Sequence, residues 1–171
     1  MMKKLLILGA GGYGKTVADV AAQLGYDEIR FLDDSRTGEN ILGKCEDFLR
    51  FADEVTDIYP AFGHNGNRMK WLDIFMKNGL SIPTLIHPRA YVSPTAKLGA
   101  GTVVLPMAVV NTGVTVKEGC IINIGALIDH DTVIEAGCHL APGAIVKAEN
   151  RIKAGSKIES DIIVQNREFP L

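Results

Sequence analysis

Two histidines in the C-terminal half of the chain are the side chains best suited to proton-transfer chemistry. His130 stands directly before Asp131, and His139 follows nine residues later. An imidazole titrates near neutral pH, and a neighbouring carboxylate orients it and stabilises its charged form, as a general base for an amine or hydroxyl requires. A histidine beside an aspartate is also common at surface turns, so the dipeptide alone does not establish a catalytic site.

A glycine-rich segment near the N-terminus has the composition of a phosphate-binding loop. Residues 9–14 spell GAGGYG, which matches G-x-G-x-x-G between an apolar run and a helical pattern. Glycines in such a loop let backbone amides and the helix N-terminus approach a phosphate. Asp33 and Asp34 end the next apolar run, where an acidic side chain can accept from a ribose hydroxyl. The alternative is a tight turn whose glycines only permit close packing.

The elements that must position these residues include a long repeat. From Val92 to Val164 an aliphatic residue recurs at every sixth position without interruption. Mostly small residues lie two positions before each aliphatic, and turn formers, often glycine, lie three positions after it. Residues two apart on a strand face the same side, so both point inward, while glycine turns the corner. Three such sides close an eighteen-residue coil, and the repeat predicts a parallel β-helix over residues 87–171.

The position of each histidine in this repeat has a consequence. His130 and Asp131 fall at a corner where glycine is usual, whereas His139 precedes an inward residue and should point outward. The two histidines are half a coil apart, so one copy of the chain should carry them on different faces. A pocket that uses both is easier to form between subunits. Glu149 and Asn150 break the corner and inward patterns, so we expect less regular coils there.

The first part of the chain has the pattern of an α/β domain, assigned to residues 1–86. Four strands and two helices are expected, the strands over Lys3–Leu8, Glu28–Leu32, Ile58–Phe62 and Leu80–Ile86 and the helices over Lys15–Leu24 and Asn67–Asn78. This segment has room for about one mononucleotide-binding half, whereas a dinucleotide fold needs two. A mononucleotide or nucleotide-sugar therefore fits better than NAD, and an NAD-dependent oxidoreductase remains an alternative that rests only on the glycine loop.

Composition excludes several partners. The formal net charge is −2, and neither lysine nor arginine forms a cluster that would attract nucleic acid or an anionic membrane. No apolar stretch approaches the roughly 20 residues of a transmembrane helix, so no membrane insertion is expected. Cys45, Cys120 and Cys138 have no CxxC spacing, so we expect neither a metal site nor a disulfide framework. A cytoplasmic location is the natural expectation.

Several short motifs together resemble those of a known enzyme family. They are GAGGYG, Phe31-Leu32-Asp33-Asp34, Gly63-His64-Asn65, Ile86-His87-Pro88, Asp129-His130-Asp131 and Ala141-Pro142-Gly143-Ala144. With these motifs the chain resembles the sialic acid O-acetyltransferase and UDP-4-amino-sugar N-acetyltransferase family over nearly its whole length. The resemblance implies a Rossmann-like N-terminal domain, a left-handed β-helix, a homotrimer and acetyl-CoA bound between neighbouring helices.

The resemblance also implies roles for individual residues. His130 would deprotonate the sugar amine or hydroxyl, Asp131 would raise its basicity, and His139 would lie near the acetyl carbonyl of the acetyl-CoA co-substrate. The nucleotide of a UDP-sugar or sialic-acid-like substrate would contact six residues, namely Gly11, Gly12, Tyr13, Asp33, Asp34 and Asn65. Tyr13 and His64 stand where the family usually has histidine and asparagine.

Two functions follow as hypotheses. The leading one is an acetyl-CoA-dependent acetyltransferase that acts on the amino group, or a hydroxyl, of a nucleotide-linked sugar. Family members usually continue through further coils that contribute to the coenzyme A site, whereas this sequence stops at Phe169-Pro170-Leu171. The alternative is therefore a non-catalytic nucleotide-sugar-binding subunit with an incomplete coenzyme A site.

Overall fold

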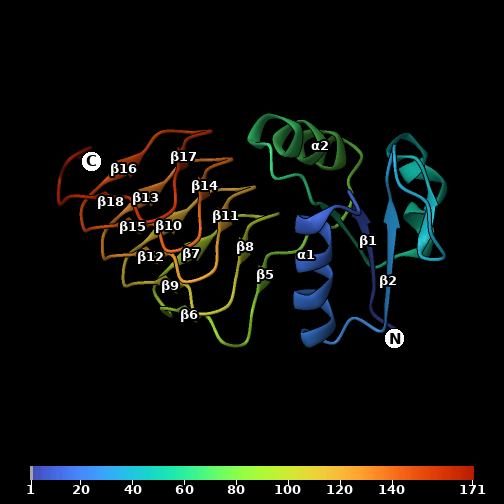
Figure 1. Cartoon of the computed structure of the whole chain (residues 1–171), viewed down its shortest axis with the longest axis horizontal. Coiled ribbons are helices and arrows are strands. Elements are labelled where there is room, and N and C mark those ends of the chain that lie inside the picture. Colours follow the sequence, from blue (N-terminus) through green and yellow to red (C-terminus); the bar gives the residue numbers. More distant parts are fainter. Residues whose placement is uncertain (1) are drawn as a thin grey trace. The chain divides into compact units, whose positions relative to one another are not determined.

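The apolar run at the start of the chain forms an interior strand of a parallel sheet. The computed structural model describes residues 2–171 and divides the chain into two units, Met1–Pro83 and Thr84–Leu171. In the first unit the strand order is β3-β2-β1-β4, with β1 at Lys4–Leu8, β2 at Glu28–Leu32, β3 at Ile41–Gly43 and β4 at Asp57–Pro60 (Figure 1). Leu5 to Leu8 are all buried, as expected for a parallel strand covered on both faces. The order of connection reverses between β1 and β4, which is where open α/β sheets bind ligands.

Two α-helices and two 3₁₀ helices complete this unit. They are α1 (Gly12–Gln23), η1 (Cys45–Arg50), η2 (Ala52–Glu54) and α2 (Asn65–Lys77). Leu6 and Leu8 pack in one apolar cluster with Phe48 of η1 and Phe75 of α2. Alternation along β1 directs Leu5 and Ile7 to the opposite face. Among residues 2–171, no helix combines the length and apolar character needed to span a bilayer.

The sequence predicted most of these elements but misplaced one strand. The segment Leu80–Ile86 is not a strand of this sheet: residues 80–84 have no regular structure, and Leu85–Ile86 form β5 in the second unit. The Ser81 carbonyl accepts from Ile58 N at 2.9 Å, but Pro83 has no N–H to donate. The short strand β3 and both 3₁₀ helices were not predicted. Helix α1 also begins earlier than expected, so Gly12 and Gly14 lie inside it.

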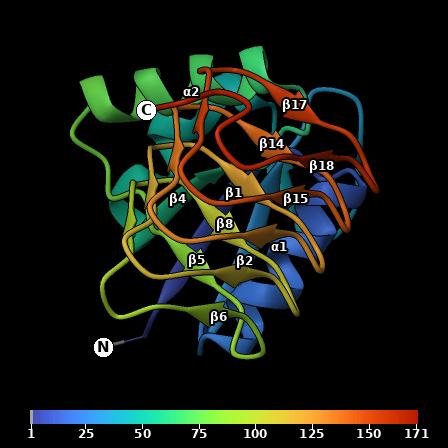
Figure 2. The same cartoon turned by 90° about the vertical axis from the view of Figure 1, so that its left-hand side faces the viewer.

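The six-residue repeat forms a parallel β-helix, as predicted. Strands β5 to β18 are two residues long and lie in three parallel sheets, ordered β16-β13-β10-β7, β17-β14-β11-β8-β5 and β18-β15-β12-β9-β6. Their bounds are Leu85–Ile86, Tyr91–Val92, Lys97–Leu98, Val103–Val104, Val109–Val110, Thr115–Val116, Ile121–Ile122, Leu127–Ile128, Val133–Ile134, His139–Leu140, Ile145–Val146, Arg151–Ile152, Lys157–Ile158 and Ile163–Val164. Paired residues are eighteen apart, for example Thr115 and Val133. Figure 2 shows β5, β8, β14 and β17 stacked in this way.

The interior and the corners of the coil follow the same period. The inward aliphatic and small residues form one buried cluster that runs from Val104 to Val164. Corner residues have positive φ at every sixth position from Gly101 to Arg167. Glycine occupies seven of these corners, whereas Met107, Asp131, Glu149, Asp161 and Arg167 adopt the left-handed conformation without being glycine. A side chain costs free energy in that conformation, so these corners are held by their surroundings.

The last coil keeps its register despite the polar residue inside it. Asn150 is fully buried, and its amide donates to the carbonyls of Gln165 and Lys147 at 2.8 and 2.9 Å. Its Oδ1 accepts from Phe169 N at 2.8 Å. The side chain is thus satisfied by backbone groups of the final turns, and pairing continues to β18.

Candidate active site

The His130–Asp131 pair lies at the corner that follows β12. His130 Nδ1 and Asp131 Oδ2 are 2.9 Å apart. An ionised carboxylate only accepts hydrogen bonds, so the neutral imidazole carries its proton on Nδ1 and leaves the Nε2 lone pair available. The hydrogen bond that His130 donates to Asp131, together with the negative charges of Asp129, Asp131 and Glu149, raises the pKa of His130. The corner therefore presents an exposed imidazole oriented as a base.

The position of Asp131 depends on its backbone conformation and on the space that Gly113 leaves for its carboxylate. Its φ of +53° lies in the left-handed region, and its N–H donates to Thr112 O at 3.0 Å. A Cβ on Gly113, one coil earlier, would lie only 2.4 Å from Asp131 Oδ1. Sequence reasoning did not identify this function of Gly113, because the contact joins residues eighteen apart.

Asp129 supports the same corner through the backbone. Its Oδ1 accepts from His130 N at 2.8 Å and from Asn111 Nδ2 at 3.0 Å. The hydrogen bond from the His130 backbone is the main reason that the pKa of Asp129 lies below its ordinary value. Asp129 thus fixes the backbone of His130, while Asp131 contacts the imidazole.

His139 lies on β14, in a different sheet from the β12 strand that leads to His130. Its Nε2 is 3.0 Å from Asn123 Nδ2, and Asn123 Oδ1 accepts from Ile124 N at 2.8 Å. The amide nitrogen of Asn123 therefore faces the ring, and Nε2 must accept. With Nε2 accepting, a neutral His139 carries its proton on Nδ1, an atom that is buried within the chain.

The four glycines of the loop after β1 divide into two kinds. A Cβ on Gly14 would lie 1.9 Å from Gly9 O, and one on Gly9, whose φ is +100°, would lie 2.8 Å from Ala61 O. These two glycines permit close packing of strand, loop and helix. A Cβ on Gly11 or Gly12 would meet no atom within 4 Å, so these two glycines leave open space at the N-terminus of α1. The close-packing interpretation is therefore confirmed for Gly9 and Gly14, and phosphate binding by Gly11 and Gly12 stays a prediction.

The two aspartates after β2 hold backbone segments together. Asp33 Oδ2 accepts from Ala10 N at 2.7 Å, and its Oδ1 accepts from Ser35 N and Arg36 N, both at 2.9 Å. Burial opposes ionisation of Asp33, but these backbone donors outweigh it and keep its pKa below the ordinary value. Asp34 Oδ1 accepts from Cys45 N at 2.9 Å. Asp33 therefore joins the glycine loop to the loop after β2.

Tyr13 and Asn65 also make contacts within the first unit. The hydroxyls of Tyr13 and Tyr59 are 3.2 Å apart. Asn65 Oδ1 accepts from Arg68 Nη2 at 2.8 Å, and Arg68 is fully buried. The first contact ties the start of α1 to β4, and the second fixes the first turn of α2.

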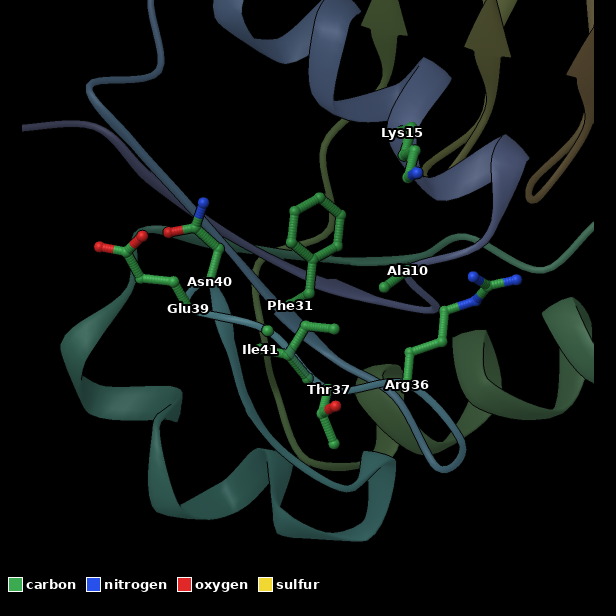
Figure 3. A pocket seen from close by; sticks show the side chains of 9 residues that line it. Ala10, Lys15, Phe31, Arg36, Thr37, Glu39, Asn40 and Ile41 are labelled. Carbon is green, nitrogen blue, oxygen red and sulfur yellow. The ribbon is translucent and has the colours of Figure 1, made fainter.

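A cavity of about 400 Å³ lies at the carboxyl ends of β1 and β2. None of the six predicted substrate residues lines it; its walls are Ala10, Lys15, Phe31, Arg36, Thr37, Gly38, Glu39, Asn40 and Ile41. Figure 3 shows the Phe31 ring in the middle, with Lys15 and Arg36 to one side and Asn40 and Glu39 to the other. A basic residue just after a glycine-rich loop was the available sequence sign for Lys15, but the loop from Arg36 to Asn40 has no motif.

Metal chemistry has no candidate site in the part of the chain that the structure describes. Among residues 2–171, no three His, Cys, Asp or Glu side chains are grouped so that they could hold a metal ion.

A smaller cavity of about 230 Å³ adjoins the His130–Asp131 corner and is lined by Asp131, Glu149, Arg167, Pro170 and Leu171. The cavity thus places two carboxylates, those of Asp131 and Glu149, and the Arg167 guanidinium beside this corner.

Comparison with known proteins places both units among sugar-modifying enzymes. Residues 4–75 match the family described as the PglD N-terminal domain. The acetyltransferase domain of PglB from Neisseria gonorrhoeae is 36% identical, with a TM-score of 0.85 over 94% of this chain and 87% of that one.

Two further solved structures contain ligands. The PglB acetyltransferase domain in complex with acetyl coenzyme A is 33% identical, with a TM-score of 0.86, and the match covers 98% of this chain and 95% of that one. PerB from Caulobacter crescentus, in complex with CoA and GDP-perosamine, is 26% identical, with a TM-score of 0.83 over 99% of this chain and 92% of that one. The likeness therefore spans both units and almost the full length of each relative.

Proposed function

We infer, from the premise that this chain belongs to the nucleotide-sugar N-acetyltransferase family, that it transfers the acetyl group of acetyl-CoA to an amino group of a nucleotide-linked sugar. Transfer to a hydroxyl, as on a sialic-acid-like sugar, is the nearest variant. The carrying observation is the His130–Asp131 pair, whose 2.9 Å hydrogen bond leaves Nε2 as a base at an exposed corner. The chain is an acyltransferase, with acetyl-CoA as its co-substrate.

The chemistry at this corner is a direct transfer. The sugar nitrogen attacks the thioester carbonyl carbon while His130 Nε2 takes the proton from that nitrogen. The C–S bond then breaks, and the proton passes from the imidazolium to the coenzyme A thiolate. Asp131 stabilises the imidazolium that forms when Nε2 takes this proton. In this proposal His139 lies near the acetyl carbonyl of a neighbouring site, where a hydrogen bond stabilises the developing oxyanion.

The nucleotide part of the substrate fits the cavity of the first unit. Lys15 and Arg36 offer two positive charges for a diphosphate, and Gly11 and Gly12 leave open space at the N-terminus of α1. Phe31 offers an aromatic face for a base. Asp33, one of the predicted residues, joins the glycine loop to the loop after β2 and so shapes this site. Tyr13, Asp34 and Asn65 remain proposed substrate neighbours.

The assembly belongs to the same proposal. His130 and His139 lie on different sheets of one coil, which favours an active site between copies of the chain. We therefore propose a homotrimer of left-handed β-helices joined to Rossmann-like units. The match to the acetyl-CoA complex covers 95% of that domain, which supports a working coenzyme A site over a non-catalytic subunit.

Acetyl transfer is tested by measuring released thiol. The purified chain is incubated with acetyl-CoA and a panel of UDP- and GDP-linked amino sugars. At least one sugar should release coenzyme A, and His130→Ala should abolish the release while leaving the melting temperature and nucleotide binding unchanged. No release from any sugar by a folded wild-type chain would overturn the proposal.

A further inference from the structure

The cavity beside β2 has two chemically different ends. Lys15 and Arg36 supply the positive charge at one end, and Asn40 supplies an amide at the other, with the Phe31 ring between them (Figure 3). On the proposed function, a nucleoside diphosphate places its phosphates at the cations and stacks its base near the aromatic ring. The edge of the base then faces Asn40.

The amide of Asn40 has a fixed orientation. Arg30 Nη1 lies 3.1 Å from Asn40 Oδ1. A guanidinium only donates, so its partner must be the amide oxygen, and the amide nitrogen must be the other branch. In Figure 3 the oxygen points away from Phe31, and the nitrogen is the other branch of the amide. Asn40 therefore offers the cavity a donor.

Arg30 is itself held, so the orientation does not depend on one contact. Its Nε donates to Glu28 Oε1 at 3.0 Å, and Glu28 also pairs with Lys4 at 3.1 Å. Glu28 and Arg30 point to the same side of β2, because they are two residues apart on one strand. Lys4 thus contacts Glu28, Glu28 contacts Arg30, and Arg30 contacts the amide oxygen of Asn40.

The backbone places this donor at a set position relative to Phe31. Phe31 N donates to Asn40 O at 2.8 Å, which ties the residue to β2 next to the aromatic ring. Ile41 N donates to Gly38 O at 3.0 Å, which closes the turn before it. The aromatic ring and the amide thus form one unit in which the base edge would meet the Asn40 nitrogen.

We propose that Asn40 selects the nucleobase of the substrate by donating a hydrogen bond to a ring carbonyl. The cavity would then prefer bases with an oxo group at this edge, such as uracil and guanine, and reject cytosine and adenine, which carry an amino group there. Two donors that face each other cannot pair, and each loses its bond to water. A free amide could turn over to accept from cytosine, but Arg30 holds its oxygen.

Calorimetric titration of the full chain with nucleoside diphosphates tests this selection. UDP and CDP differ at position 4 of the ring and in the proton on the adjacent N3, and IDP and ADP differ in the same way at position 6 and N1 of a purine. UDP should bind about tenfold more tightly than CDP, and IDP more tightly than ADP, because one unmatched polar pair costs roughly that factor. Asn40→Ala should bind UDP and CDP equally.

Two further variants separate base reading from general binding. Asn40→Asp has only acceptors, so it should shift the UDP-to-CDP ratio towards CDP. Arg30→Met frees the Asn40 amide to turn over, so it should tighten CDP binding and leave UDP binding nearly unchanged. Equal binding of UDP and CDP by the wild type, or a full preference retained in Asn40→Ala, would overturn the selection and leave acetyl transfer standing. If none of the four diphosphates binds, the proposed nucleotide site fails, and the selection fails with it.

Discussion

The basicity of His130 depends on one carboxylate at a strained corner. Asp131 occupies a left-handed position where seven other corners have glycine. A glycine there would relax the backbone but remove the acceptor for His130 Nδ1, which lies 2.9 Å away. The strained backbone at Asp131 therefore accompanies a contact that only a side chain can make, and such strain is common at functional sites.

Replacing Asp131 by asparagine should change the pH dependence of the reaction. His130 acts as a base only when neutral, so kcat/KM rises as the pH increases through its pKa. Because Asp131 raises that pKa, Asp131→Asn should move the acid limb to lower pH. The plateau should fall by roughly 10²-fold or more, since an amide does not stabilise the imidazolium. A pH–rate profile of both chains measures this, and an unmoved acid limb would contradict it.

Gly113 should be needed to position Asp131, and Gly125 provides a matched control. Both glycines have positive φ, +71° and +65°, so alanine strains the backbone similarly at each. Only at Gly113 would the new Cβ meet the Asp131 carboxylate, at 2.4 Å. Gly113→Ala should therefore lower kcat about tenfold or more and shift the acid limb, whereas Gly125→Ala should change neither. Equal kcat losses in the two variants, with equal melting temperatures, would mean that the contact does not matter.

At the level of elements, the β-helix is stabilised by stacking from one coil to the next. Each coil contacts only its neighbours, so the last one has a partner on one side alone. Asn150 compensates by bonding the backbone of the final turns at Lys147, Gln165 and Phe169. The polar residue that looked like a defect in the repeat is thus a support for the end of the coil.

Asn150→Ala should destabilise the chain by about 2–3 kcal/mol, because it removes the hydrogen bonds that a fully buried amide makes to backbone groups of the final turns. Asn166→Ala is the control, since Asn166 is exposed on the same last coil and its loss should cost under about 0.5 kcal/mol. Urea unfolding followed by circular dichroism gives both values. Similar unfolding midpoints for the two variants would show that the buried amide contributes nothing.

Local patterns explain which elements the sequence revealed. The aliphatic series from Val92 to Val164 repeats without a break, so the coil and its eighteen-residue pairing were predictable. Leu80–Ile86 has an apolar composition too, and Ser81 O accepts from Ile58 N of the edge strand β4, but Pro83 removes a donor and no ladder forms. Strand β3 is three residues long and carries too little pattern to be recognised.

The same reasoning explains what the sequence revealed of the sites. His130 and Asp131 are adjacent, so their interaction was visible as a dipeptide. The cavity joins Lys15, Phe31 and Asn40 from separate segments, and only the folding of β2 against the loop after it brings them together. The orientation of Asn40 depends on Arg30, ten residues earlier, which no local motif records.

At the scale of the whole molecule, the positions of the two histidines favour a shared active site. His130 follows β12 and His139 lies on β14, and these strands belong to different sheets. A base and an oxyanion donor must both reach one acetyl group, within about 3 Å of the reacting atoms. One coil presents them on different faces, so adjacent copies in a closed ring would bring one from each.

Mixing two inactive variants should therefore restore activity. In a ring, each site takes His130 from one copy and His139 from the next. Co-expression of His130→Ala and His139→Ala chains in equal amounts should leave about one site in four with both histidines, and so about a quarter of the wild-type rate. The doubly substituted chain, co-expressed with either single variant, is the control and should restore nothing. If the mixture is only as active as the mean of the two variants, both histidines act within one chain or His139 takes no part.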